Sequence, residues 1–168
     1  SVELSLSESL IVINALAVKR AQLRGSAWSA VGKQVEKPLM QTLCKLFQVP
    51  ESNFKLRARS GAQREADFCL VDRENNEYLC EVKLMGRGNP ESADAAFARD
   101  SRIFIADTLS ENNVSQLDAH GIQWITLNEP DSWRRFGEVL RHLNIPHTPF
   151  EGDLNAALGR IFSELPND

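Results

Sequence analysis

The sequence predicts an α/β fold, in which helices flank a mixed β-sheet. Three segments with strand periodicity follow one another between residues 54 and 83, which predicts a meander of antiparallel strands. Two further apolar strands, at 102–106 and 122–127, each follow a helical stretch, so crossover connections should set them parallel to a neighbour or to each other. The 168 residues, 42% hydrophobic and 25% charged, are expected to form one domain, residues 1–168, with its own core.

The chain before the meander has helical periodicity. Residues 5–8 form a capping-box pattern that opens a helix over 5–23, and Gly25 ends it. A second helix is expected over 28–47, where Pro38 should kink or divide it because proline lacks the N–H that a helix interior needs. The apolar stripe of this second helix consists of Val31, Val35, Leu39, Leu43, Leu46 and Phe47.

The helices after the meander are predicted from their caps. A helix over 91–100 follows an N-cap at Asn89 and a proline at its first position. Ser110 caps a helix that ends at Gly121, and two more helices, near 132–143 and 153–165, close the chain.

Composition limits the class of protein. The net charge of −4 argues against a generic basic coat for nucleic acid, although a local basic groove stays compatible with it. Three cysteines in apolar runs are typical of reduced core residues in a cytoplasmic protein. The most apolar stretch, 10–18, is too short to cross a bilayer, and no membrane partner is expected. The chain starts at Ser1 and not at Met, as in a processed or trimmed chain or one domain of a longer protein.

Three charged residues mark two adjacent predicted strands, Asp67 on the first and Glu81 and Lys83 on the second. Residues i and i+2 of a strand share a face, so Glu81 and Lys83 should lie side by side. Asp67 shares this face only if the numbers of any two residues paired between the strands add up to an even value. That requires a loop with an odd number of residues. A three-residue loop over 74–76, with Asn76 in the left-handed conformation, meets this condition, whereas a two- or four-residue loop would not.

This trio has two interpretations. Exposed ion pairs on a sheet surface are common and contribute ~0–1 kcal/mol. The two strands are strongly apolar, however, and unpaired carboxylates would be costly in the centre of an α/β domain. A bound divalent cation would offset that cost, and carboxylates are the oxygen ligands that Mg²⁺ prefers.

The order of helix Glu36, strand Asp67 and strand Glu81-x-Lys83 resembles the PD-(D/E)XK nuclease superfamily, which includes many type II restriction endonucleases. The likeness extends from about Gly32 to Leu127, with Ala66 where the superfamily name has proline. The segment 81–95 further resembles the CfrBI-type restriction enzymes.

The resemblance implies a role for each residue. Asp67, Glu81 and the carbonyl of Val82 would coordinate Mg²⁺, and Lys83 would orient or activate the hydrolytic water and stabilise charge on the phosphate. Glu36 matches the helical acid that many members contribute to the same site. The alternative for Glu36 is a solvated residue that pairs with Lys33 or Lys37.

Two segments are candidate DNA contacts. The densest basic stretch, residues 55–64, immediately precedes Asp67, and its arginines suit contacts with phosphates and guanine edges. The alternative interpretation is that this stretch forms the polar face of an edge strand. The loop 86–90 has glycines that let the backbone approach DNA, and a plain tight turn would explain the glycines but not Arg87. We expect Arg57 or Arg59 to contact phosphate and Arg87 to contact a base. The full set of candidates is Lys55, Arg57, Arg59, Gln63, Arg64, Arg87 and Asn89.

The sequence therefore predicts a magnesium-dependent DNA endonuclease, of the type II restriction class, that acts on double-stranded DNA. One active site per chain implies a homodimer or two successive nicks. A DNA repair or junction-resolving nuclease on the same fold is the first alternative. A DNA-binding module that does not cleave is the second, and the intact trio Asp67, Glu81 and Lys83 argues against it.

Overall fold

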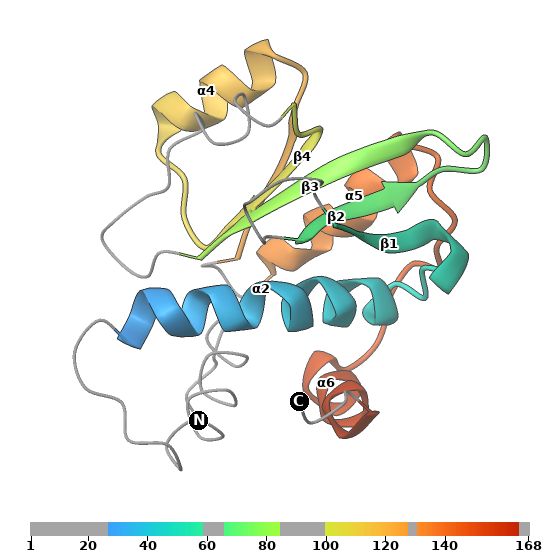
Figure 1. The fold of residues 1–168 in the computed structure, drawn as a ribbon. Coiled ribbons are helices and arrows are strands. Elements are labelled where there is room, and N and C mark those ends of the chain that lie inside the picture. The colour runs from blue at the N-terminus through green and yellow to red at the C-terminus, as the bar shows by residue number, and fades with distance from the viewer. Residues whose placement is uncertain (1–26, 59–65, 85–99, 128–130, 165–168) are drawn as a thin grey trace.

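A computed structural model describes residues 27–58, 66–84, 100–127 and 131–164, and only the main chain at 27–35, 56–58, 66–67 and 162. The described residues form a five-stranded sheet with helices on both faces (Figure 1). The strands are β1 Phe54–Ala58, β2 Ala66–Val71, β3 Glu77–Lys83, β4 Ile103–Ala106 and β5 Gln123–Thr126. The helices are α2 Ala27–Leu46, α4 Glu111–Ala119, α5 Arg135–His142 and α6 Leu154–Glu164, with 3-10 turns η2 Glu51–Asn53 and η3 Ser132–Arg134.

The strand pairing confirms the predicted mixed sheet. The strand order is β1-β2-β3-β4-β5, in which β1, β2 and β3 form an antiparallel meander. The pairs β3–β4 and β4–β5 are parallel, as expected for strands reached through crossovers. The predicted helices over 5–23 and 91–100 lie outside the described residues. The result is a meander joined to a parallel half, with β3 as the strand common to both.

The β2–β3 hairpin has the predicted parity but a different loop. The paired residues, such as Phe68 with Cys80, sum to an even number throughout. The amide of Asp72 also bonds the carbonyl of Asn76 at 3.1 Å, so the three-residue loop is 73–75 and not 74–76. Asn75, with φ of 68°, occupies the left-handed position that was expected for Asn76.

The side chain of Asp72 explains this register. Asp72 is buried, and its Oδ1 accepts from the backbone N–H groups of Glu74 (2.8 Å) and Asn76 (2.9 Å). Its Oδ2 accepts from the Asn76 amide (2.8 Å) and the Tyr78 hydroxyl (3.0 Å). These bonds lower the pKa of Asp72, with the Asn76 side chain as the largest cause. The hydrogen bond to Asp72 raises the pKa of Tyr78.

The two faces of the sheet carry different residues because side chains alternate along each strand. One face packs against α2, α5 and α6 in the larger core, to which Phe68, Cys80, Val82 and Ile105 belong. The other face supplies Phe104 and Ala106 to a smaller cluster with Leu117 of α4. Figure 1 shows α2 and α6 on one side of the sheet and α4 on the other.

Helix α2 passes through Pro38 as one α-helix, so the predicted division of the helix does not occur. A proline inside a helix costs about 3 kcal/mol, since a backbone hydrogen bond is lost. The turns after Pro38 bury Leu39, Met40 and Leu43 completely, and this packing offsets that cost. The hydroxyl of Thr42 also donates to the Pro38 carbonyl at 2.7 Å, within the turn that follows the proline.

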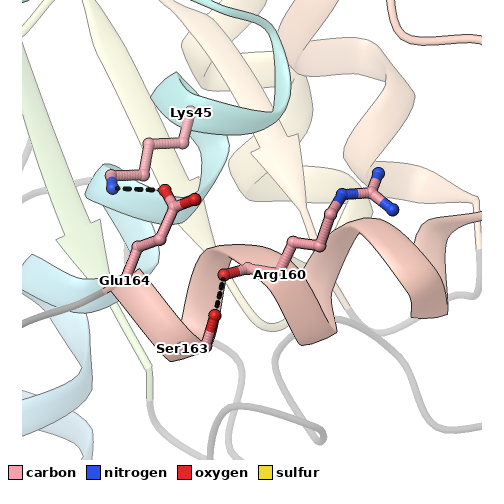
Figure 2. A network of polar contacts seen from close by, with 4 residues as sticks. All are labelled: Lys45, Arg160, Ser163 and Glu164. Atoms are coloured by element: carbon pink, nitrogen blue, oxygen red, sulfur yellow. Dashed lines mark hydrogen bonds and ion pairs between the residues drawn. The ribbon is translucent and has the colours of Figure 1, made fainter.

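Helix α6 packs against α2 near the end of the described chain. Ala157, Leu158 and Ile161 of α6 are buried in the larger core. At the edge of this contact, Lys45 Nζ lies 3.4 Å from Glu164 Oε2 (Figure 2). Because both side chains are largely exposed, this ion pair contributes only ~0–1 kcal/mol, and the apolar contacts hold α6 in place.

Other expectations can be checked against the described residues. Ser110 caps α4 by accepting from the Asn113 N–H at 3.2 Å, and Gly121 with φ of 66° follows the helix end. Cys44, Cys69 and Cys80 are buried thiols, as predicted, and burial raises the pKa of Cys44 and Cys80. None of the helices in the described ranges is long and apolar enough to cross a membrane.

Candidate active site

Glu81 and Lys83 form the centre of the candidate site. Glu81 is 4% exposed although it carries a carboxylate, and Lys83 Nζ lies 3.3 Å from its Oε1. A lone buried carboxylate would cost several kcal/mol, and the ion pair with Lys83 offsets part of that cost. The predicted placement of these two residues side by side at the end of β3 is confirmed.

Asp67 reaches the same row of the sheet through the β2–β3 register. Phe68 with Cys80 is the last pair of this antiparallel register, and Asp67 and Glu81 are the next residues of their strands beyond it. Continued by one residue, the register would set Asp67 opposite Glu81 on the same face. The side chain of Asp67 lies outside the described part.

The site lies where a meander strand meets a parallel strand. Glu81 pairs with the buried Phe104 of β4, and Lys83 pairs with Ala106. Lys83 is the last residue of β3, and its carbonyl accepts from the Asp107 N–H at 3.3 Å. Crevices beyond the carboxyl ends of parallel strands are the usual ligand sites of open α/β sheets. The ammonium of Lys83 is thus held at such an end.

Glu36 lies on the opposite layer. Helix α2 packs on the face that carries Cys80 and Val82, whereas Glu81 and Lys83 belong to the other face. Glu36 is three residues before Leu39 and is half-buried with a polar partner, so it is not a freely solvated residue. It would have to reach the site around the end of the sheet.

The described side chains do not by themselves make a metal centre. Within the described ranges, no three His, Cys, Asp or Glu side chains come close enough together to hold an ion. The site therefore depends on Asp67 for its second carboxylate. The donor set of Asp67, Glu81 and the Val82 carbonyl consists only of oxygen atoms and includes a buried anion, which fits a hard cation such as Mg²⁺.

Most of the candidate DNA contacts lie outside the described residues: Arg59, Gln63, Arg64, Arg87 and Asn89. Lys55 is exposed and forms an ion pair with Glu77 across β2. Arg57, two residues further along β1, pairs in the backbone register with Asp67. Lys55 and Arg57 look equivalent in the sequence, but the structure gives them different partners.

One acidic residue near the site was not singled out from the sequence. Asp107 is 7% exposed and directly follows β4, and its N–H bonds the carbonyl of Lys83. Its Oδ1 accepts from the Thr108 N–H at 3.1 Å, which stabilises the turn there. An acidic residue immediately after the apolar run 103–106 was the available signal, because such a position lies at the carboxyl end of a buried strand.

Comparison with known proteins gives one match. A family model described as CfrBI restriction endonuclease matches residues 1–114 of the 168. The matched region contains all three members of the proposed trio and ends within α4. No curated protein and no solved structure gives a significant match to the chain.

Proposed function

Because the chain belongs to the CfrBI restriction endonuclease family, we propose that it cleaves double-stranded DNA as a magnesium-dependent type II restriction enzyme. The single observation that carries the chemical part is the buried carboxylate of Glu81, which lies beside Lys83 and in register with Asp67. This arrangement is what the PD-(D/E)XK resemblance implies, and it supports the assignment of the chain to that superfamily.

Each residue of the proposed site would have a separate role in the reaction. Asp67, Glu81 and the carbonyl of Val82 would hold Mg²⁺, with Glu36 as an additional outer ligand. Magnesium, when bound, would supply Lewis acidity that polarises the phosphate and offsets its charge. Lys83 would orient the attacking water and stabilise charge that builds on the phosphate oxygens. Its ammonium is suited to this because it is fixed by Glu81 at the end of β3.

The reaction is a hydrolysis and needs no further reactant. The water oxygen forms a bond to phosphorus while the bond from phosphorus to the 3′ oxygen breaks. The water loses one proton, and the leaving 3′ oxygen gains one, so the products are a 5′-phosphate and a 3′-hydroxyl. With one site per chain, a double-strand break needs either two chains or two successive nicks, and we propose a homodimer on double-stranded DNA.

The direct test is incubation of the protein with supercoiled plasmid DNA and magnesium. Discrete linear fragments with 5′-phosphate ends are expected. Calcium in place of magnesium should support binding but not cleavage, since calcium binds to oxygen ligands with looser geometry. Random fragments would point instead to a nuclease without sequence preference, and intact DNA under all metal conditions would contradict the proposal.

A further inference from the structure

The row of residues across the site has a third member on β1. In the β1–β2 register Arg57 is paired with Asp67. The β2–β3 register ends at Phe68 and Cys80, and continued by one residue it would set Asp67 opposite Glu81. Neighbouring strands are about 4.8 Å apart, so the row Arg57–Asp67–Glu81 spans about 10 Å on one face of the sheet. An arginine position thus lies at the end of the row away from Lys83.

The charge in this row changes during the reaction. Glu81 already has one cation, Lys83, at 3.3 Å. With Mg²⁺ bound, the metal and Lys83 would together balance Asp67, Glu81 and one phosphodiester. Attack by water adds negative charge on the phosphate oxygens, and a cation on the Asp67 side would stabilise that added charge. Arginine suits that position because its planar donors match two phosphate oxygens at once and its charge persists when water is excluded.

We propose that Arg57 is a catalytic residue that binds the phosphate undergoing cleavage from the β1 side, opposite Lys83. This inference rests on the proposed function and gives Arg57 a narrower role than a general DNA contact. Its guanidinium would stabilise the charge that develops on the phosphate oxygens during attack. Its loss should therefore slow cleavage of bound DNA more than it weakens binding.

Lys55 provides a comparison within the same strand. It lies two residues before Arg57 and hence on the same face, but its register partner is Cys69 and not an acidic residue of the site. Its ammonium is engaged by Glu77. A basic residue that merely lines the DNA path should behave like Lys55, and this makes the contrast between the two positions informative.

The test compares Arg57→Ala, Arg57→Lys and Lys55→Ala with the wild type. Arg160→Ala is the control for loss of an arginine, because Arg160 is exposed on α6 and points away from the Lys45–Glu164 pair (Figure 2). Dissociation constants are measured on plasmid fragments in calcium. Single-turnover cleavage rates are measured in magnesium with protein in excess, and thermal melting reports folding.

For Arg57→Ala we expect the cleavage rate of bound DNA to fall by roughly 100-fold or more, as when one charge-stabilising donor is removed, while affinity changes little. Lys55→Ala should lose affinity rather than rate, and Arg160→Ala should match the wild type in both. Arg57→Lys keeps the charge but not the planar donors, so its rate should lie between those of Arg57→Ala and the wild type. This variant also decides the matter if Arg57→Ala does not fold.

Three results would overturn the inference while leaving the proposed function intact. Arg57→Ala could cut bound DNA at the wild-type rate, or it could lose only affinity, as Lys55→Ala is expected to do. A lower melting temperature with an unchanged rate would reduce Arg57 to a salt-bridge partner of Asp67 and would likewise overturn it. A wild-type protein that cuts no DNA would remove the proposed function and this inference together.

Discussion

The burial of Glu81 is the feature that favours a reactive site over an ordinary surface ion pair. A surface pair would leave its carboxylate in water, yet this side chain is almost fully buried. Lys83 supplies one positive charge beside it, at 3.3 Å. In the proposed site, Mg²⁺ would supply the positive charge for the second acidic residue, Asp67, and Arg57 is the residue of β1 that pairs with Asp67.

Asp72 gives a prediction about stability and pH. Its pKa is lower in the folded protein than in the unfolded chain, chiefly because the Asn76 amide bonds its carboxylate. Such a group stabilises the fold above its unfolded pKa of about 4, and the contribution is lost as pH falls through the lower folded value. Asp72→Asn should therefore destabilise the protein at neutral pH, and the difference from wild type should shrink below about pH 4.

Urea unfolding at a series of pH values measures this difference in the free energy of unfolding. Glu151→Gln, which removes an exposed carboxylate in the loop before α6, is a control for the change in net charge. A gap between Asp72→Asn and wild type that stays constant from pH 7 to pH 3 would contradict the role given to the charged form.

At the scale of elements, the hairpin shows what sequence can and cannot establish. The alternation along 66–72 and 77–83 predicted both strands, and the predicted parity holds for the pairs from Phe68–Cys80 to Val71–Glu77. The loop was wrong by one residue. Asn75 and Asn76 both tolerate the left-handed conformation, so local propensity cannot choose between them. The choice depends on Asp72, whose side chain binds the loop only after it has formed.

The helices likewise have features that the sequence predicts and features that depend on tertiary packing. The stripe from Leu39 to Phe47 predicted the buried side of α2, whereas the effect of Pro38 depended on tertiary packing that local rules do not contain. For the site, the trio could be named from sequence because spacing along a strand fixes the face. The difference between Lys55 and Arg57 could not be predicted from the sequence, because it arises from their partners on other strands.

The packing of α5 against the end of α2 gives a second stability prediction. A Cβ added at Gly137 would lie 2.5 Å from Cε1 of Phe47, whose ring is fixed between Trp133 and Phe136. Overpacking of this kind costs about 1–3 kcal/mol. Alanine gains about 1 kcal/mol over glycine inside a helix. Gly137→Ala should therefore lower the free energy of unfolding.

The sign should reverse when the ring is removed. In a Phe47→Leu background the contact is relieved and only the helix gain remains, so adding Gly137→Ala should stabilise that variant. Urea unfolding of the four proteins in this double-mutant cycle is the measurement. Destabilisation of similar size in both backgrounds would show that Phe47 is not what restricts Gly137.

At the scale of the whole molecule, the net charge of −4 is compatible with the proposed DNA substrate, because binding depends on the local distribution of charge and not only on the sum. Lys55, Arg57 and Lys83 belong to one face of the meander, while α2 and α6 cover the other face. DNA would therefore approach the face opposite α2. The matched family region, which contains the meander and β4, includes every residue of the proposed site.

The central claim is that Asp67, Glu81 and Lys83 form the site that hydrolyses DNA. The most direct measurement is plasmid cleavage in magnesium by Asp67→Ala, Glu81→Ala and Lys83→Ala, with binding measured in calcium. Glu77→Gln, which changes another carboxylate of β3 on the same face, is the matched control. We expect each alanine variant to fold and bind DNA but to lose cleavage, while Glu77→Gln cuts. Cleavage at near wild-type rate by any of the three alanine variants would contradict the assignment of that residue.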